Sequence, residues 1–223
     1  MNAAEPLPIL LRGDARLEQR CAPVERPAGT RTGRAGRRIG IDDKLDDTLR
    51  TAAARMHATL DAFRSRTGFG RALAAPQVGL LQRIIVMNLR DAPQSASATS
   101  AAFLKKSGAG PFTPFTAFTL INPHFTWLSD DFIEVWDDCL SIPDIVVRVR
   151  RRASLTVKFR DLDWRVHTWP RVPPDVSELL QHEVDHLDGI LMTARAHGPN
   201  PIRPITDRDA LVAPSRRAAK QDS

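Results

Sequence analysis

The feature that most constrains this chain is residues 181–186 (QHEVDH), which fit a helix with a carboxylate on its apolar side. At about 100° per residue, one stripe of such a helix is formed by Val176, Leu179, Leu180 and Leu187. Glu183 falls within this stripe, and His182 and His186 lie along its edge. Removing a carboxylate from water is costly unless a cation or a metal accompanies it. Two histidines four residues apart, with a glutamate after the first, supply two metal ligands and an adjacent general base.

The residues around this stretch predict where the helix begins and ends. Asp175 can cap the backbone amides of the first turn, Glu178 completes a capping box, and the preceding prolines keep the chain extended. Gly189 is a natural helix stop, and Asp185 is expected on the polar side. The alternative is a charged helix that carries two histidines by chance. The position of Glu183 on the apolar side argues against that alternative.

The charge of the chain does not by itself identify a partner. The formal net charge is +6, but much of the excess lies in residues 31–38 and in the tail at Arg216, Arg217 and Lys220. Both segments flank or interrupt the patterned parts of the chain, and no nucleic-acid recognition module is visible. We therefore expect no sequence-specific binding of nucleic acid.

The two cysteines, Cys21 and Cys139, do not make a disulfide framework, which fits a reducing compartment. The amino terminus has a short apolar run broken by proline and lacks the basic segment of a secretory signal. No apolar stretch approaches the length needed to span a membrane. We expect a cytoplasmic protein without membrane contact, long enough at 223 residues to bury a core.

The hydrophobic pattern predicts an α+β fold. A helical pattern runs over residues 41–66, and residues 70–79, rich in small side chains, predict a loop or an edge strand. Strands are predicted at residues 83–89, 118–123, 132–141, 145–149 and 154–159. Several strands followed by one central helix indicate an α+β domain.

A catalytic zinc-type site needs three protein ligands, so the helix leaves one ligand to be found. The metzincin continuation would place a third histidine at Met192, and a thioether is a poor ligand for a hard or borderline ion. No convincing acidic helix follows Arg195, which argues against the glutamate ligand of thermolysin-like proteases. The remaining candidates are His57, His124, His167, His197, Cys21 and Cys139.

Cys139 stands out among these candidates because it ends a predicted strand, just before a proline-bounded turn that would hold its side chain rigidly. As a thiolate it would bind a divalent metal strongly and release a proton on binding. Taken alone, a cysteine in this position is more often a residue of the core. Cys21, in the amino-terminal segment, is expected to be a small buried hydrophobic residue.

Three segments, in this order, resemble the motifs of peptide deformylases: residues 70–77 (GRALAAPQ), 139–141 (CLS) and 181–186 (QHEVDH). The amino-terminal PILLRGDARLEQRCAPVE, the strand LINP and the continuation HLDGILM are similar as well. The resemblance implies antiparallel sheets packed around a central, carboxy-terminal HExxH helix.

The resemblance also sets the expected domain organisation. We expect residues 1–223 to form a single domain with a deformylase-like core at residues 8–193. An Arg-rich loop at 26–40 and an inserted loop at 91–117 interrupt this core, and the tail at 196–223 is expected to be irregular.

The resemblance implies that Cys139, His182 and His186 bind one divalent metal, which is Fe(II) in most relatives, with zinc, nickel or cobalt as alternatives. Water in the fourth position would be the nucleophile. Glu183 would act as general base on that water and then pass the proton to the leaving amine.

Two further residues are implied to stabilise the oxyanion, through the side-chain amide of Gln77 and the backbone N–H of Leu140. The implied substrate is the formylated amino-terminal methionine of a nascent polypeptide, and formate is the product. Such an enzyme would work near the ribosome and contact it transiently.

The expected substrate rim consists of Gly70, Arg71, Ala72 and Asp138. This rim departs from the family pattern, because Asp137-Asp138 replaces the usual Glu-Gly before the cysteine and Ala72 replaces a glycine. Arg71 replaces a common valine or isoleucine, and Glu178 replaces what is commonly an arginine or an apolar residue. Asp137 is able to pair with an arginine such as Arg151, and Arg71 to recognise a carboxylate on a short substrate.

Two other functions compete with deformylation of nascent chains. A deformylase-like enzyme could act on a different small formamide, and sequence does not separate this function from the first. A catalytically silent, metal-stabilised binding protein would be expected to have lost Glu183, Gln77 or a metal ligand, and none is lost. A generic HExxH endopeptidase lacks its third ligand.

Overall fold

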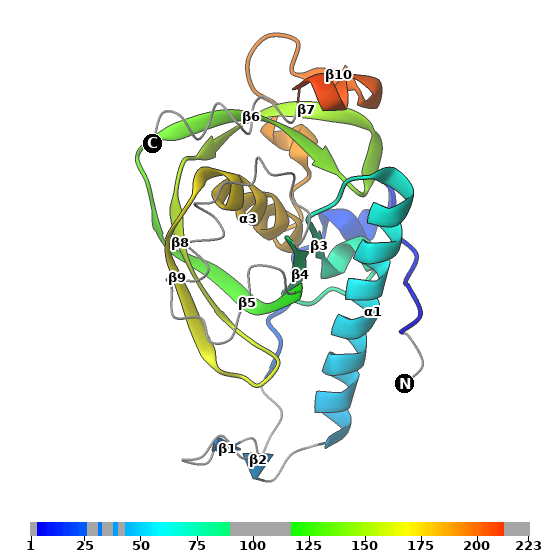
Figure 1. The fold of residues 1–223 in the computed structure, drawn as a ribbon, viewed down its shortest axis with the longest axis vertical. Helices are drawn as coiled ribbons and strands as arrows, with labels where there is room; N and C mark the ends of the chain where they lie inside the picture. Colours follow the sequence, from blue (N-terminus) through cyan, green and yellow to red (C-terminus); the bar gives the residue numbers. More distant parts are fainter. Residues whose placement is uncertain (1–3, 26–30, 33–37, 40–42, 90–116, 212–223) are drawn as a thin grey trace.

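The computed structural model describes residues 4–25, 31–32, 38–39, 43–89 and 117–211 (Figure 1). Its principal helices are α1 (Asp43–Thr67) and α3 (Pro174–Leu187). Short 3₁₀ helices connect the larger elements and comprise η1 (Ala15–Glu18), η2 (Ala75–Val78), η3 (Met192–Arg195) and η4 (Ile205–Asp207).

A five-stranded antiparallel sheet forms one wall around α3 (Figure 1). Its strands follow the order β3 (Ala72–Ala74), β4 (Ile84–Asn88), β5 (Ala117–Leu128), β8 (Leu155–Arg160) and β9 (Val166–Val172). Within the described residues β3 is an edge strand, since it pairs only with β4. On its other side, β3 has no strand partner among the described residues.

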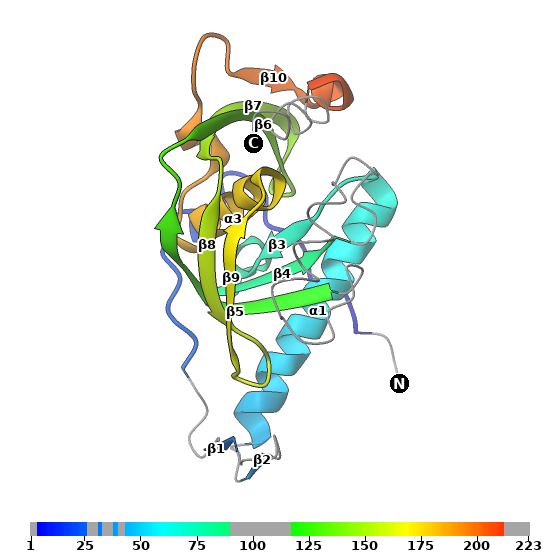
Figure 2. The ribbon, with the colours of Figure 1, turned by 60° about the vertical axis from the view of Figure 1, so that its left-hand side comes forward.

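A three-stranded antiparallel sheet lies across α3 from the first sheet (Figures 1 and 2). Its order is β10 (Ile202–Pro204), β7 (Ile142–Arg152) and β6 (Phe132–Cys139). The β6–β7 hairpin turns tightly, with Cys139 opposite Ile142 and a register shift just before Cys139. A separate small ladder joins β1 (Arg31–Thr32) to β2 (Arg38–Ile39).

Strands β3 and β4 are buried on both faces, which explains their continuous apolar sequence. Successive strand residues point to opposite faces, so Ile85 and Met87 join the cluster that α3 covers. The intervening Ile84 and Val86 join the cluster that α1 covers. Both strands are thus held between α3 and α1, as Figure 2 shows.

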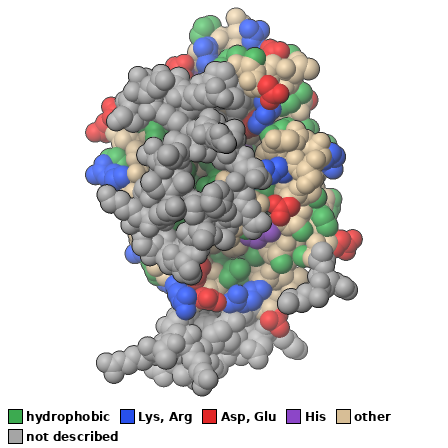
Figure 3. Space-filling model, in the orientation of Figure 1, with side chains coloured by type: hydrophobic (Ala, Val, Ile, Leu, Met, Phe, Trp, Pro, Cys, Tyr) green, Lys and Arg blue, Asp and Glu red, His purple; other side chains and the backbone are tan. Residues whose placement is uncertain are grey.

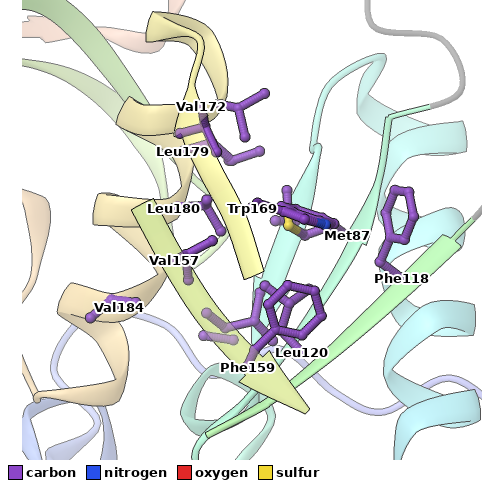
Figure 4. Close-up of a cluster of buried hydrophobic side chains, with 14 of the residues drawn as sticks. Met87, Phe118, Leu120, Val157, Phe159, Trp169, Val172, Leu179, Leu180 and Val184 are labelled. Atoms are coloured by element: carbon purple, nitrogen blue, oxygen red, sulfur yellow. The ribbon is translucent and has the colours of Figure 1, made fainter. Parts of the chain in front are cut away.

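The packing between α3 and the five-stranded sheet is centred on Trp169 of β9 (Figure 4). Its ring meets Phe118 and Phe159 edge-on, with centroid separations of 5.4 and 5.0 Å. Leu180 and Val184 bring the apolar side of α3 onto this cluster. Burying a leucine side chain of this kind contributes about 1.5–3 kcal/mol, so these contacts fix α3 firmly against the sheet.

The predicted α+β fold with antiparallel sheets around the HExxH helix is confirmed, as are the helix near 41–66 and all five predicted strands. Strand β9 was not predicted because its sequence alternates poorly and contains Pro170. A proline is tolerated there since β9 is an edge strand. The tail beyond 196 is less irregular than expected, because β10 and η4 form within it.

The predicted capping box of α3 is wrong. The helix begins at Pro174 with Pro173 as its cap and no side-chain capping bond, and Glu178 pairs with Arg71 instead. The predicted stop is confirmed, since Gly189 has a positive φ of 74° directly after the helix. The predicted loop at 91–117 lies outside the described residues except for its last residue, and the loop at 26–40 is described only at β1 and β2.

Candidate metal centre

Helix α3 positions two of the three predicted ligands. His182 and His186 are four residues apart and therefore lie on one face of the helix, with ring centroids 4.9 Å apart. Both are buried against the sheets, with 6% and 1% of their surface exposed. The helix thus presents two imidazoles side by side in a site that excludes bulk water.

The third predicted ligand comes from the three-stranded sheet. Cys139 ends β6 and is buried, and its Sγ lies 3.3 Å from His186 Nε2. One ligand atom from each of Cys139, His182 and His186 lies within 4.8 Å of the other two. The structure therefore brings together the three side chains that the sequence analysis selected.

These residues fit a transition metal by their chemistry. One thiolate and two imidazoles, without oxygen ligands, suit iron, zinc, nickel or cobalt rather than calcium or magnesium. The buried Nδ1 of His186 and the buried Oε2 of Glu183 have no hydrogen-bond partner among the described residues. Uncompensated buried polar atoms are rare, and here they lie at and beside the ligand set.

An ionic network behind the histidines fixes their orientation. Asp137 accepts hydrogen bonds from His182 Nδ1 at 3.2 Å and from Arg151 Nη2 at 2.8 Å. Burial disfavours the charged carboxylate, but Arg151 and His182 outweigh it and hold the pKa of Asp137 well below its usual range. Because Nδ1 of His182 is occupied by Asp137, its Nε2 is left to face Cys139 and His186. The predicted pairing of Asp137 with Arg151 is confirmed.

Asp185 extends this network, against the prediction that it lies on a polar outer side. It is buried, and it binds Arg151 at 2.5 Å and Arg195 at 2.7 Å. Both arginines come from outside α3, so the pattern of the helix alone could not reveal them. Arg195, which binds Asp185 behind the predicted ligands, was not predicted from the sequence.

Gln77 and Leu140 flank the ligand set. The side-chain oxygen of Gln77 accepts from the backbone N–H of Ala74 at 2.9 Å, which directs its Nε2 the other way. That Nε2 donates to Ser141 Oγ at 3.2 Å and lies 3.7 Å from Cys139 Sγ. Leu140 follows Cys139 directly and is buried. Both predicted oxyanion donors thus lie next to the predicted metal ligands.

Glu183 is buried beside His182, as its place on the apolar side of the helix predicted. Burial raises the pKa of its carboxyl group to about 7, although His182 and Arg71 lower it and Asp137 and Glu178 raise it further. Cys21, in contrast, lies in the core away from the ligands, and burial raises the pKa of its thiol to about 11. The prediction that Cys21 is a buried core residue is confirmed.

The sequence model of the family described as polypeptide deformylase matches residues 6–201. The chain belongs to the peptide deformylase family. Curated peptide deformylases from Wolbachia of Brugia malayi and from Wolbachia pipientis wMel are 33% and 32% identical to it. These alignments cover 72% and 83% of this chain, and 78% and 84% of the relatives.

Solved structures agree with this assignment. Peptide deformylase from Thermotoga maritima matches with a TM-score of 0.62 and 24% identity, over 87% of this chain and 99% of that chain. The class I type b enzyme from Acinetobacter baumannii with Met-Ala-Ser bound matches with a TM-score of 0.60 and 26% identity, over 86% and 99%. The chain is therefore an enzyme, a metal-dependent hydrolase with peptide deformylase activity.

The rim of this deformylase carries two ion pairs at positions where the sequence departs from the family pattern. Arg71 pairs with the buried carboxylate of Glu178 and donates to the backbone carbonyl of Asp175 at 2.9 Å. A substrate carboxylate would have to compete with Glu178 for Arg71, which argues against the carboxylate recognition expected from sequence. Asp138 pairs with Arg208 at 2.6 Å. Arg208 was not predicted, because it lies in the tail that was expected to be irregular.

The remaining rim residues are Gly70, which lies beside Leu140, and Ala72. Gly70 has a positive φ of 113°, and a side chain there would meet Leu140, Leu60 and Phe63 at 3.4–3.6 Å. Ala72 is buried in β3. Glycine at position 70 is thus favoured by its backbone conformation, whereas a Cβ would make only ordinary contacts.

Two features of the described residues concern membranes and nucleic acid: the hydropathy of the helices and the distribution of charge on the surface. None of the described helices is both long and apolar enough to cross a membrane. In Figure 3, basic and acidic side chains are interspersed over the described part of the visible face.

The ionic network predicts that Asp137 is required for stability. Asp137→Ala leaves Arg151 as a buried charge that keeps only Asp185, and breaking a buried pair in this way costs about 3–5 kcal/mol. Urea unfolding of the metal-free protein should show this loss at neutral pH. Glu134→Ala, at a half-exposed position on the same strand, should cost far less.

The pH dependence of this loss has a defined sign. The pKa of Asp137 is lower in the folded than in the unfolded protein, so its stabilisation is present at neutral pH and lost on acidification. The difference between wild type and Asp137→Ala should therefore shrink below the ordinary carboxyl pKa of about 4. A difference that stays constant from neutral pH to below this value would contradict the role assigned to the Asp137 carboxylate.

Proposed function

We propose that this enzyme removes the formyl group from the amino-terminal methionine of newly made polypeptides and releases formate. The observation that supports this most strongly is the convergence of Cys139, His182 and His186 around a buried Glu183 in a chain of this family. Cytoplasmic location and transient contact with the ribosome belong to this proposal, since the substrates emerge there.

Cys139, His182 and His186 would hold one divalent metal, and we propose Fe(II) as the ion used in the cell. When bound, the metal supplies a Lewis acid that lowers the pKa of a coordinated water. Asp137 holds His182 in the tautomer that a ligand requires, with the proton on Nδ1. The low exposure of both histidines keeps competing water away from the reacting group.

Glu183 is proposed to accept a proton from the attacking water and to deliver it to the nitrogen of the leaving amine. Its buried carboxylate lies close enough to His182 to interact with its charge, and its unpaired Oε2 is available for the proton. A general base works best with a pKa near the working pH, which a buried carboxyl group can reach.

Gln77 and Leu140 are proposed to stabilise the negative charge that develops on the formyl oxygen. The backbone N–H of Ala74 fixes the side-chain oxygen of Gln77, so the Nε2 group of Gln77 is already oriented toward Cys139. The backbone N–H of Leu140 is held at the end of a tight hairpin. Such pre-oriented donors contribute most where the site excludes water.

The peptide portion of the substrate is proposed to lie as an extended strand along the side of β3 that has no strand partner among the described residues. Main-chain pairing with Ala72 and its neighbours would bind any sequence, and the rim at Gly70, Arg71 and Asp138 would surround the first residues. The relative from Acinetobacter baumannii has been solved with Met-Ala-Ser bound, which supports a short peptide as ligand.

A second candidate function is favoured by the ion pair between Arg71 and Glu178. Glu178 lies one helical turn before His182 on the same face, so the pair makes a polar wall close to the ligand set. A polar wall suits a formylated residue with a hydrogen-bonding side chain better than methionine. The enzyme would then act on a different small formamide with the same chemistry.

The proposed function predicts formate release from formyl-Met-Ala-Ser by anaerobically purified, Fe(II)-loaded protein. Formyl-Met-Ala-Ser should be cleaved with a higher kcat/KM than the matched peptide that begins with formyl-Gln. The reverse order would favour the second function. No release from either peptide by protein with stoichiometric metal would contradict both.

Glu183→Gln should retain the metal but lose turnover, because the amide keeps the shape of the side chain but cannot accept the proton. The expected decrease in kcat is about 10²–10⁴-fold. Metal analysis and a formate assay on the same sample separate the two effects. Glu134→Gln, on the surface of β6, serves as the matched control. Substantial activity in Glu183→Gln would rule out its role as the base.

A further inference from the structure

A carboxy-terminal segment beyond the family match folds back onto the site. The family match ends at residue 201, and β10 follows it directly. Strand β10 pairs with β7, with Ile202 opposite Val147 and Pro204 opposite Ile145. Figures 1 and 2 both show β10 and the helical turn after it beside β7, toward the same end of the molecule as the end of α1 that leads into β3. The segment is thus anchored on the hairpin that carries Cys139.

Arg208, at the end of this segment, contacts both sides of the site. Its Nε donates to Asp138 Oδ2 at 2.6 Å, and Asp138 directly precedes Cys139. Its guanidinium carbon lies 4.3 Å from the ring centroid of Phe69, which directly precedes Gly70. One side chain therefore joins the chain segment before the cysteine ligand to the segment that leads into β3.

Holding Asp138 and Arg208 together in this partly buried position costs free energy. The side chains of Asp138 and Arg208 are only 9% and 21% exposed. Fixing a long arginine side chain costs conformational entropy, and a partly buried carboxylate needs a partner. Asp138 stands where the family pattern has a glycine, and its partner comes from beyond the family match. The pair therefore joins a position that departs from the family pattern to a segment outside the family match.

The direction of a bound peptide places its later residues near Arg208. Gln77 follows the end of β3 and faces Cys139, so the formyl group lies at that end of the strand. A peptide that pairs antiparallel with β3 then runs toward Gly70 and Phe69. At about 3.3 Å per residue, its second and third residues reach the start of β3, where Arg208 covers Phe69.

We propose that Arg208 is a specificity-determining residue that binds the substrate main chain after the formylated residue. This inference rests on the proposed function of the site. Asp138 holds Nε and so fixes the plane of the guanidinium, while Asp209, which holds Nη1 at 3.0 Å, is 95% exposed and binds weakly. The outer N–H groups of Arg208 donate to a backbone carbonyl of the second or third residue of the peptide.

The test compares peptide lengths in wild type, Arg208→Ala and the control Arg203→Ala. Arg203 is exposed on β10 and keeps the segment otherwise intact. A hydrogen bond from a charged donor is worth enough to change binding about tenfold or more. We expect Arg208→Ala to raise KM for formyl-Met-Ala-Ser about tenfold at constant kcat, and to leave KM for formyl-Met amide nearly unchanged. Arg203→Ala should match wild type on both substrates.

Direct binding of the product separates a failure of this inference from a failure of the proposed function. Calorimetric titration with Met-Ala-Ser and with methionine amide requires no turnover. Arg208→Ala should weaken only the tripeptide. Equal losses for both ligands, or no loss for either, would overturn the inference whether or not the enzyme releases formate.

Loss of Arg208 could weaken binding only because the Asp138 carboxylate loses its arginine partner. The double variant Arg208→Ala with Asp138→Gly removes that carboxylate as well and so distinguishes the two explanations. If Arg208 binds substrate, the double variant keeps the weaker binding of Met-Ala-Ser. If the double variant binds Met-Ala-Ser as wild type does, Arg208 only neutralises Asp138 and the inference is wrong.

Discussion

The site depends on the buried carboxylate of Asp137, which joins the three-stranded sheet to α3. It accepts hydrogen bonds from His182 on α3 and from Arg151 on β7, and it lies two residues before Cys139 on β6. Strand alternation puts Asp137 and Cys139 on the same face, so this contact also sets the distance between thiol and imidazoles. Buried ionic groups are costly when any partner is missing. The geometry of the ligands and the stability of the fold are therefore coupled.

The metal site was largely predictable because its signals are local. The spacing of His182 and His186 and the unfavourable place of Glu183 both follow from helix periodicity. Cys139 was selected by its place at a strand end, and the family resemblance made the choice specific. The role of each of these residues stays a prediction, although the structure brings the ligand atoms together.

The supporting and rim contacts were not predictable, since each joins residues far apart in the sequence. Glu178 looks like part of a capping box until Arg71 is placed against it from the loop before β3. Asp185 looks exposed until Arg151 and Arg195 surround it. Arg208 was not predicted as a site residue because it follows β10 and η4, and β10 forms only by pairing with β7. Tertiary context decides all three.

The identity of the thiolate ligand is the central claim, and cobalt absorption tests it most directly. Cobalt(II) bound to a thiolate gives a sulfur-to-metal charge-transfer band in the near ultraviolet, which imidazole and carboxylate ligands do not give. Wild type and Cys21→Ser, loaded with cobalt, should both show this band, and Cys139→Ser should lack it. A band that persists in Cys139→Ser, or that disappears in Cys21→Ser, would contradict the assignment of Cys139 to the metal.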